Sequence, residues 1–403
     1  MSIRDLEEGG RWLLPDGVEE ILPPRARHIE LLRRRLLDLF DRWGYELVVP
    51  PLIEYLESLL VGVGHDLDLQ TFKVTDQLTG RMMGVRADLT SQAARIDAHS
   101  LGREGPTRLC YAETVLRARP EGLSGSRAPI RIGAELYGVP GPAGDAEVLA
   151  LMSATLRTAG LERAEVELGH VAVYRGLAGA AGLAPAAEAQ LFDAVQRKAR
   201  ADVAALLEDV PGEAGRMLRA LPELYGGPEV LAEARSVLAG APAPVVAALD
   251  ELEAIRAILE RRAPELELGF DLAELYGYHY HTGAVFSAYA PDHGRAVARG
   301  GRYDDIGGAF GRARPATGFD ADLKVLAERT APQDGARELV TAPDDAGLPA
   351  DRAAALWDAV AGLRGRGVRV VVGDAPGATL RLEWRDGAWA SVPLVRKRAD
   401  GES

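Results

Sequence analysis

Apolar residues recur at helical spacing near the start of the chain, at Ile29, Leu32, Leu36, Leu37 and Phe40. One apolar residue every three or four positions predicts an amphipathic helix over residues 24–43. Gly44 ends this pattern. Residues 45–49 then form an apolar, β-type run that two prolines close, so we expect a strand there.

Between residues 72 and 138, short β-type runs alternate with turn residues. We expect strands at 72–74, 84–86, 108–117 and 130–138. The last two predict an antiparallel hairpin whose polar tip covers 120–129. Asp88 and Thr90 stand where a helix would begin, and either side chain suits its N-cap.

The second half of the chain first becomes helical and then returns to strands. The Ala- and Leu-rich stretch 185–264 has periodic apolar positions, which favours an insertion of four or five short helices. We expect strands at 280–289 and 296–297, and a helix over 319–330. Strands and helices mixed without strict βαβ order predict an α+β fold, with an antiparallel sheet flanked by helices.

A length of 403 residues is ample for two or three domains. A linker over 331–335 separates a predicted core, residues 1–330, from a small C-terminal α/β domain, residues 338–403. In the smaller domain we expect a helix at 353–363, a buried strand at 368–372 and a hairpin turn at 385–387.

Amino-acid composition limits the cellular compartment and the binding partners that we expect for this protein. One cysteine, Cys110, excludes a disulfide framework and predicts a reducing, cytoplasmic setting. The first ten residues are acidic and polar, unlike a secretory signal, and no apolar run is long enough to predict a membrane span. A net charge of −13 disfavours tRNA as a partner, because nucleic-acid binders usually present a basic face. The basic clusters 33–35 and 396–398 are interpreted as solvated surface.

Four segments of the chain contain recognisable sequence motifs. They are a helix and strand that lead to Pro50, the predicted hairpin, Tyr-Gly-Tyr-His-Tyr-His-Thr-Gly at 276–283, and 300–326 with its Gly-Gly-Arg-Tyr-Asp and Thr-Gly-Phe. In this order they resemble the three class II motifs and the histidine signature of histidyl-tRNA synthetase, over about residues 10–330. The resemblance implies a class II aminoacyl-tRNA synthetase-like fold and a homodimer formed through the first motif. It also implies that the C-terminal domain is a shortened relative of an anticodon-binding domain.

Three positions that the synthetase uses for adenylation hold different residues here. A carboxylate of the second motif is replaced by Arg119, the signature arginine by Tyr276, and the third-motif arginine by Val325. Loss of one electrostatic contact to the reacting groups typically costs about 10²–10³ in rate, so three independent losses would cost around 10⁶. We therefore expect a protein with no catalytic residues and no cofactor.

The positions that bind the amino acid in the synthetase are altered less than the positions used for adenylation. Free histidine needs a carboxylate for its α-ammonium, a cation for its α-carboxylate and hydrogen bonds to its ring. By resemblance, the histidine-binding residues are Asp88, Thr90, Arg117, Arg131, Glu135, Tyr280 and His281. The two acids and the threonine are expected at the ammonium and Arg117 at the carboxylate. Tyr280 and His281 are expected on a strand that faces the ring.

Several of these residues have other interpretations. Arg131 replaces a synthetase glutamine and can instead pair with a nearby acid, while His281 replaces a tyrosine. Asp88 and Thr90 can simply cap a helix, and Glu135 can pair with an arginine.

Two further patterns could indicate other chemistry. His279 and His281 stand two apart, as in a metal pair, but no cysteine or further histidine lies nearby in the sequence, so we expect no metal site. Gly-Gly-Arg at 300–302 could cradle a phosphate, but a tight turn between strands is favoured.

A synthetase core that keeps an amino-acid pocket and lacks adenylation residues resembles the regulatory subunit of ATP phosphoribosyltransferase. The Tyr-His-Tyr-His run at 278–281 fits that family. The resemblance implies a role in the first step of histidine biosynthesis. There this subunit is required for the activity of a short-form catalytic subunit and for feedback inhibition by histidine. It further implies a hetero-octamer, without tRNA or membrane. The alternative is a divergent histidyl-tRNA synthetase or another amino-acid-adenylating enzyme.

Overall fold

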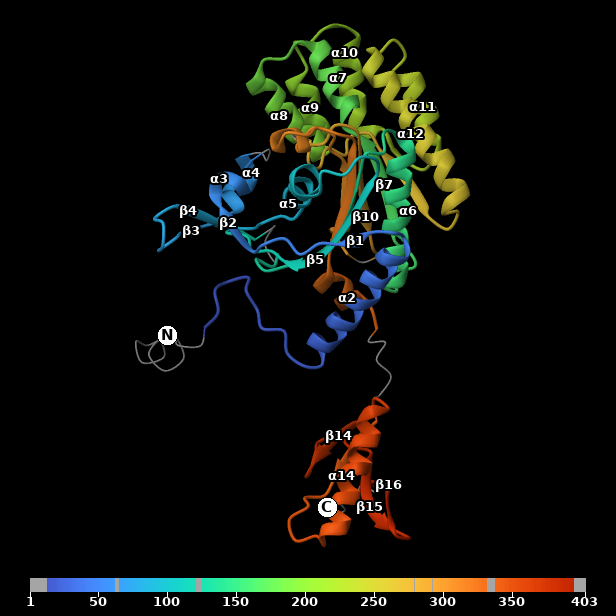
Figure 1. The fold of residues 1–403 in the computed structure, drawn as a ribbon. Coiled ribbons are helices and arrows are strands. Elements are labelled where there is room, and N and C mark those ends of the chain that lie inside the picture. Colours follow the sequence, from blue (N-terminus) through green and yellow to red (C-terminus); the bar gives the residue numbers. More distant parts are fainter. Residues whose placement is uncertain are drawn as a thin grey trace, which may run out of the picture. The chain divides into compact units, whose positions relative to one another are not determined.

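The computed structural model describes residues 13–61, 65–120, 125–278, 280–291, 293–331 and 338–394. The chain forms two compact units that divide after Ala331 (Figure 1). Part of the expected hairpin tip, most of the expected linker and the basic cluster at 396–398 lie outside the described residues. Among the helices of the described part of the chain, none is long and apolar enough to cross a membrane.

A mixed sheet of nine strands forms the centre of the first unit. Its spatial order is β1 (Glu46–Leu47), β5 (Thr107–Thr114), β6 (Ile130–Tyr137), β12 (Ala316–Asp322), β11 (Ala296–Arg302), β10 (Ala284–Tyr289), β7 (Glu165–His170), β9 (Glu267–Asp271) and β8 (Tyr225–Gly226). Neighbours pair antiparallel, except that β1 with β5 and β7 with β9 are parallel. The predicted α+β fold on a largely antiparallel sheet is confirmed.

One face of this sheet carries the main hydrophobic core. The helices that pack on it are α2 (Arg25–Arg42), α6 (Pro142–Thr158), α12 (Ala243–Arg262) and α13 (Leu323–Arg329). The first predicted helix is confirmed to within one residue at each end, and its apolar residues Leu32, Leu36 and Phe40 are buried in this core. Burial of each such side chain contributes roughly 1.5–3 kcal/mol, so this face holds the unit together.

Strand alternation separates the core from the opposite face, because successive side chains point to opposite sides of a sheet. On β6 and β12 the core residues are Ile132, Ala134, Leu136, Phe319 and Ala321. The intervening residues Arg131, Glu135 and Asp320 therefore face away from α2 and α6. On that face α5 (Thr90–Arg95) packs Ala93 against Tyr111 of β5.

Two further groups of elements complete the first unit. The helical segment comprises α7 (Val171–Ala181), α8 (Pro185–Gln196), α9 (Arg200–Leu206), α10 (Gly212–Ala220) and α11 (Glu229–Val237), besides α12. Figure 1 shows these helices gathered at one end of the sheet. A second sheet has the order β2 (Ile53–Tyr55), β4 (Met82–Val85) and β3 (Phe72–Thr75), and α3 (Leu56–Leu59) and α4 (His65–Gln70) lie between β2 and β3 in the chain.

The C-terminal unit is a four-stranded sheet with one helix. Its strands follow the order β14 (Arg369–Val372), β13 (Leu339–Ala342), β15 (Leu380–Arg385) and β16 (Ala388–Pro393), and α14 (Ala350–Gly365) packs on them. The predicted hairpin turn is confirmed: Asp386 and Gly387 both have positive φ, as two-residue hairpin turns require. The expected buried strand is only partly buried, because Val371 and Val372 are exposed.

The expectation of a turn at residues 300–302 is wrong. These residues complete β11, which lies between β10 and β12. Glycine is needed because of close packing rather than turn geometry. A Cβ on Gly301 would lie 2.7 Å from the His281 ring and 2.8 Å from the carbonyl oxygen of Ala284.

The helix expected over residues 319–330 starts later than predicted. Residues 317–321 pair with β6 on one side and β11 on the other, and Asp322 pairs with β6, so backbone hydrogen bonding keeps them extended. The helix α13 then begins at Leu323, where Asp322 Oδ1 accepts a hydrogen bond from the Lys324 backbone N–H at 3.0 Å and caps the helix.

Candidate functional site

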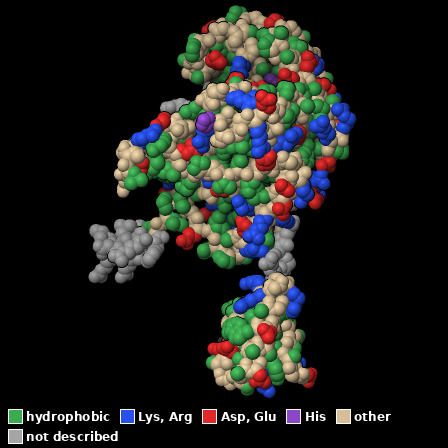
Figure 2. All heavy atoms as spheres, viewed as in Figure 1, with side chains coloured by type: hydrophobic (Ala, Val, Ile, Leu, Met, Phe, Trp, Pro, Cys, Tyr) green, Lys and Arg blue, Asp and Glu red, His purple; other side chains and the backbone are tan. Residues whose placement is uncertain are grey.

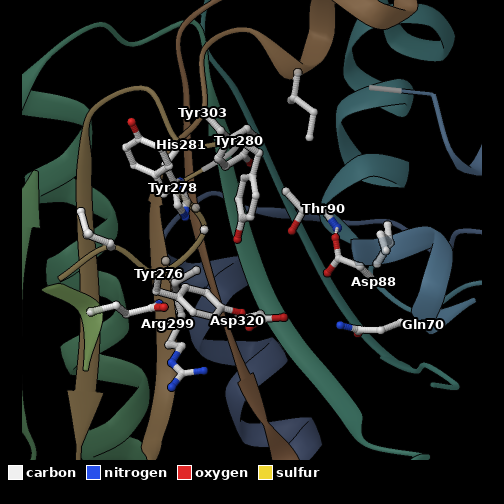
Figure 3. Close-up of a pocket in the computed structure, with 18 of the residues that line it drawn as sticks. Gln70, Asp88, Thr90, Tyr276, Tyr278, Tyr280, His281, Arg299, Tyr303 and Asp320 are labelled. Atoms are coloured by element: carbon white, nitrogen blue, oxygen red, sulfur yellow. Dashed lines mark hydrogen bonds between the residues drawn. The ribbon is translucent and has the colours of Figure 1, made fainter. Parts of the chain in front are cut away.

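A cavity of about 840 Å³ opens on the sheet face that lies opposite α2 and α6. Its walls come from the sheet, the start of α5, the segment before β10, and α8. It is lined by all seven residues that the sequence nominated: Asp88, Thr90, Arg117, Arg131, Glu135, Tyr280 and His281. Residues from distant parts of the chain thus converge on one concave site (Figure 3), which is typical of small-molecule pockets.

Glu135 lies at a buried, aromatic end of the cavity. Only 1% of its surface is exposed, the Tyr111 hydroxyl donates to Oε1 at 2.9 Å, and the Tyr303 hydroxyl donates to Oε2. Burial raises the pKa of Glu135 to about 8, against the effect of the two hydroxyls. Near neutral pH this carboxyl is therefore largely protonated, and a donor or cation that enters the cavity would favour its ionised form.

Asp88 and Thr90 stand at the start of α5. Asp88 Oδ2 accepts a hydrogen bond from the Thr90 backbone N–H at 3.1 Å, so this aspartate does hold the start of the helix. Burial, followed by the nearby Asp320 carboxylate, raises the pKa of Asp88. Figure 3 shows Asp88, Thr90 and Gln70 on one wall, with Asp320 and Tyr280 across from them.

Arg131 forms an ion pair with Asp320. Its Nε donates to Oδ2 at 2.8 Å and its Nη2 donates to Oδ1, and the two side chains are 15% and 13% exposed. The alternative in which Arg131 pairs with an acid is confirmed, and the pair also forms part of the cavity wall. The arginine charge is thus balanced before any ligand arrives.

The expectation that Tyr280 and His281 lie on a strand is wrong, because β10 begins only at Ala284. Both residues belong to a tight turn. The Gly277 carbonyl accepts hydrogen bonds from the backbone N–H of Tyr280 at 3.0 Å and of His281 at 2.9 Å. Gly277 has φ 65°, a left-handed conformation that glycine adopts without a Cβ penalty. This turn presents the Tyr280 ring to the cavity (Figure 3).

The His281 ring is wedged between two glycines. A Cβ on Gly277 would lie 2.5 Å from Cδ2 of the ring, and one on Gly301 would lie 2.7 Å from Cε1. Nδ1 lies 3.1 Å from the Arg302 carbonyl oxygen, so the N–H is assigned to Nδ1. Burial lowers the pKa of His281 to about 4, which keeps the ring neutral. Among the described residues Nε2 has no hydrogen-bond partner, which leaves it as a buried acceptor.

The turn that carries Tyr280 and His281 is fastened to the helical segment. The ring of Tyr278 packs against Tyr174 of α7 and Phe192 of α8, with centroids 5.5 and 5.1 Å apart. Arg175 Nη2 donates to the Tyr278 carbonyl oxygen at 3.0 Å. Because α8 also lines the cavity, residues that line the cavity and residues that pack on the helices share this turn.

The three altered adenylation positions lie in different surroundings. Tyr276 lines the cavity, and the Arg299 guanidinium lies 4.3 Å from the centre of its ring. Val325 packs against the hydrophobic core, and Arg119 is exposed. The third-motif position therefore faces the core instead of delivering a cation to the cavity.

No group of three or more His, Cys, Asp or Glu side chains in the described part of the chain is arranged to hold a metal ion. His279, one of the two histidines weighed as a metal pair, lies outside the described residues.

Some lining or supporting residues were not nominated from the sequence: Gln70, Tyr111, Arg299, Tyr303 and Asp320. Asp320 shares the open face of the sheet with Glu135, so the strand alternation of β12 would have found it once β12 was recognised as a strand. The tyrosine hydroxyls gave no comparable signal, because their approach to Glu135 depends on packing.

The sheet, its motif-bearing hairpin and the polar cavity define a class II aminoacyl-tRNA synthetase-like protein. The family model for histidyl-tRNA synthetase matches residues 17–326. A solved histidyl-tRNA synthetase from a Nostoc species has the same fold, with a TM-score of 0.74, 17% identity and coverage of 92% of this chain and 91% of that one.

More similar relatives carry a narrower name. A Pseudomonas putida ATP phosphoribosyltransferase regulatory subunit is 57% identical over 96% of this chain and 99% of its own length. One from Thioalkalivibrio sulfidiphilus is 58% identical over 91% and 92%. A Bacillus halodurans structure described as an ATP phosphoribosyltransferase regulatory subunit/histidyl-tRNA synthetase has a TM-score of 0.79 and 29% identity, and covers 91% and 94%. The chain belongs to the family of ATP phosphoribosyltransferase regulatory subunits.

Proposed function

We propose that this chain binds free histidine in the cavity and transmits that binding to a short-form catalytic ATP phosphoribosyltransferase subunit, without catalysing a reaction itself. The observation that carries the proposal is the convergence of the seven nominated residues on one cavity, in a family named for regulation. Binding that differs between active and inactive assemblies is what feedback inhibition requires.

The cavity has two ends that suit the two ends of histidine. Tyr303, Tyr280 and His281 surround the end where Glu135 lies, with the His281 and Tyr303 rings 6.5 Å apart. An imidazole fits there, donating its N–H to Glu135. This geometry favours a ring contact for Glu135 over the ammonium contact expected from the sequence.

The other end is charged. Asp88 with Thr90 suits the α-ammonium, and Arg117 and Arg131 suit the α-carboxylate. Neither group of residues requires a metal or a cofactor.

A second candidate function is amino-acid adenylation, which the match to the histidyl-tRNA synthetase family model favours. The positions of Tyr276 and Val325 argue against it, because neither supplies positive charge to a reacting phosphate. Histidine-dependent ATP–pyrophosphate exchange separates the two functions. Exchange above background would support the adenylating enzyme and sink the regulatory proposal.

The proposal includes a homodimer formed through the first-motif region. Large apolar side chains are exposed there: Leu47 50%, Val49 70%, Leu52 47% and Ile53 41%. Leu47 belongs to β1, the edge strand of the main sheet. A contiguous apolar stretch at a sheet edge suits an isologous contact with a second copy.

The full assembly is proposed to be a cytoplasmic hetero-octamer with the catalytic subunit. The single cysteine, which is free and buried, agrees with a reducing compartment. On the face shown in Figure 2, basic side chains are interspersed with acidic and neutral ones, which suits a protein partner better than tRNA.

The proposal is tested by reconstitution. The chain is mixed with a short-form catalytic subunit from the same organism, and the condensation of ATP with phosphoribosyl pyrophosphate is followed while histidine is titrated. Activity that needs this chain and falls with histidine supports the proposal. Activity that is the same with and without this chain contradicts it.

A further inference from the structure

Asp320 occupies a functional position that no motif assigned to it. It lies on β12 with its side chain on the open face of the sheet, and it lines the cavity with 13% of the side chain exposed. Its two oxygens each accept one hydrogen bond from Arg131. A carboxylate offers about four lone-pair sites, so Asp320 can accept further donors from the cavity without releasing Arg131.

A second carboxylate faces the same space. Asp88 lines the cavity from α5, and Figure 3 shows Asp88 and Asp320 directed toward the gap between their walls. Burial and then the Asp320 carboxylate raise the pKa of Asp88, against the charges of Arg131 and Arg117. A cation placed near both carboxylates would favour the ionised form of Asp88.

The same space also carries groups that suit the rest of a zwitterionic ligand. Arg117 and Arg131 line the cavity together with the two aspartates. The cavity thus combines acidic and basic side chains, which a ligand with both an ammonium and a carboxylate can pair with.

We propose that Asp320 is a specificity-determining residue that accepts the ligand's α-ammonium together with Asp88 while it remains paired with Arg131. The inference rests on the proposed histidine site. It makes the paired Arg131 and Asp320 a complementary surface for a zwitterion, with the arginine toward the carboxylate and the aspartate toward the ammonium. The cavity then selects free amino acids over analogues that lack the amino group.

The competing explanation is that Asp320 only holds Arg131 in place. The two explanations differ in which part of the ligand should respond to a change at Asp320. If Asp320 contacts the ammonium, its removal matters only for ligands that have one. If it merely positions Arg131, its removal changes binding of every ligand with a carboxylate.

The test measures dissociation constants by calorimetry on the full chain, for wild type and Asp320→Asn, with histidine and with imidazolepropionate, which lacks the ammonium. We expect histidine to bind about 10–100-fold more weakly to Asp320→Asn, the range for a charge-assisted hydrogen bond. We expect imidazolepropionate binding to change by less than about 3-fold, since it makes no such bond. Equal changes for both ligands, or unchanged histidine binding, would overturn the proposal.

Two further variants keep this test decisive. Asp193→Asn removes a charge from the α8 wall of the same cavity and should leave the ratio of the two affinities unchanged. The double variant Arg131→Gln, Asp320→Asn removes both partners of the ion pair, so no buried charge is left alone if the single variant folds poorly. In the double variant, the affinity for histidine relative to that for imidazolepropionate should fall as it does in the single variant. A relative affinity equal to that of wild type would overturn the proposal. A wild-type chain that binds no histidine at all would instead refute the histidine site itself.

Discussion

The substitution Glu135→Gln should make the chain more stable at alkaline pH while it weakens histidine binding. Glu135 is buried with both oxygens occupied by the hydroxyls of Tyr111 and Tyr303, and its pKa is raised to about 8. In the unfolded chain the same carboxyl ionises near its ordinary pKa of 4.5. Between these two values the folded state keeps a proton that the unfolded state has released.

The sign and the magnitude follow from proton linkage. Because the folded state binds more protons in this window, the free energy of unfolding falls as pH rises, by about 1.4 kcal/mol per pH unit for one group. From pH 5.5 to 8 the wild-type chain should lose about 3 kcal/mol through Glu135 alone. A glutamine does not titrate and loses none of this. Other titrating groups contribute equally to both proteins and cancel in the comparison.

The assay is thermal melting of both proteins at several pH values. The melting temperature of Glu135→Gln relative to wild type should rise steadily between pH 5.5 and 8, by several degrees in total. Glu188→Gln is the matched control, because it changes a half-buried carboxyl on the α8 wall of the same cavity. Parallel curves for Glu135→Gln and wild type would refute the reasoning.

Three further predictions concern the site and its surroundings. Gly277→Ala should weaken histidine binding and lower the melting temperature, because the new Cβ would lie 2.5 Å from the His281 ring and the φ of residue 277 is 65°. Gly179→Ala is the control and should do neither, because the space around Gly179 is open. Leu47→Asp should convert a dimer to monomers in light scattering while the melting curve stays cooperative, and an unchanged mass would contradict the dimer contact. Tyr278→Leu should weaken histidine binding severalfold. Tyr278→Phe should largely keep it, since the ring contacts with α7 and α8 remain while the long hydrogen bond from the hydroxyl to Glu188 Oε1, 3.5 Å, is lost.

Residues that follow regular periodicity were predictable from the sequence. The first helix needed only the spacing of Leu32, Leu36 and Phe40, and the hairpin that carries Glu135 was read from two β-type runs. All seven nominated residues line one cavity. They were found from motifs shared with a family of known fold, and amino-acid composition alone could not have located them.

The sequence failed where tertiary contacts decide the local structure. The strand expected to include Tyr280 is a turn, since Gly277 adopts a left-handed conformation and its carbonyl accepts two backbone hydrogen bonds. Residues 317–321 are extended because two neighbouring strands pair with them. The bond between Arg131 and Asp320 spans 189 positions, which no local pattern reports.

The turn that carries Tyr280 and His281 both lines the cavity and packs on the helical segment. Tyr280 and His281 face the cavity, while Tyr278 is held by α7 and α8. A ligand that changes the position of this turn must also change the packing of Tyr278. In the proposed regulation, occupation of the cavity would therefore reach the helical segment through one covalent segment, without an extended chain of intermediates.

The proposed regulation requires that histidine act on the catalytic partner through this cavity. The most direct measurement is the histidine concentration that halves phosphoribosyltransferase activity in the reconstituted assembly, compared for wild type and Asp88→Asn alongside the histidine dissociation constant of each free chain. Both quantities should rise by the same factor, roughly 10-fold or more for loss of a charged contact. Weakened binding to the isolated chain with unchanged inhibition of the assembly would contradict it, because the effector would then act at another site.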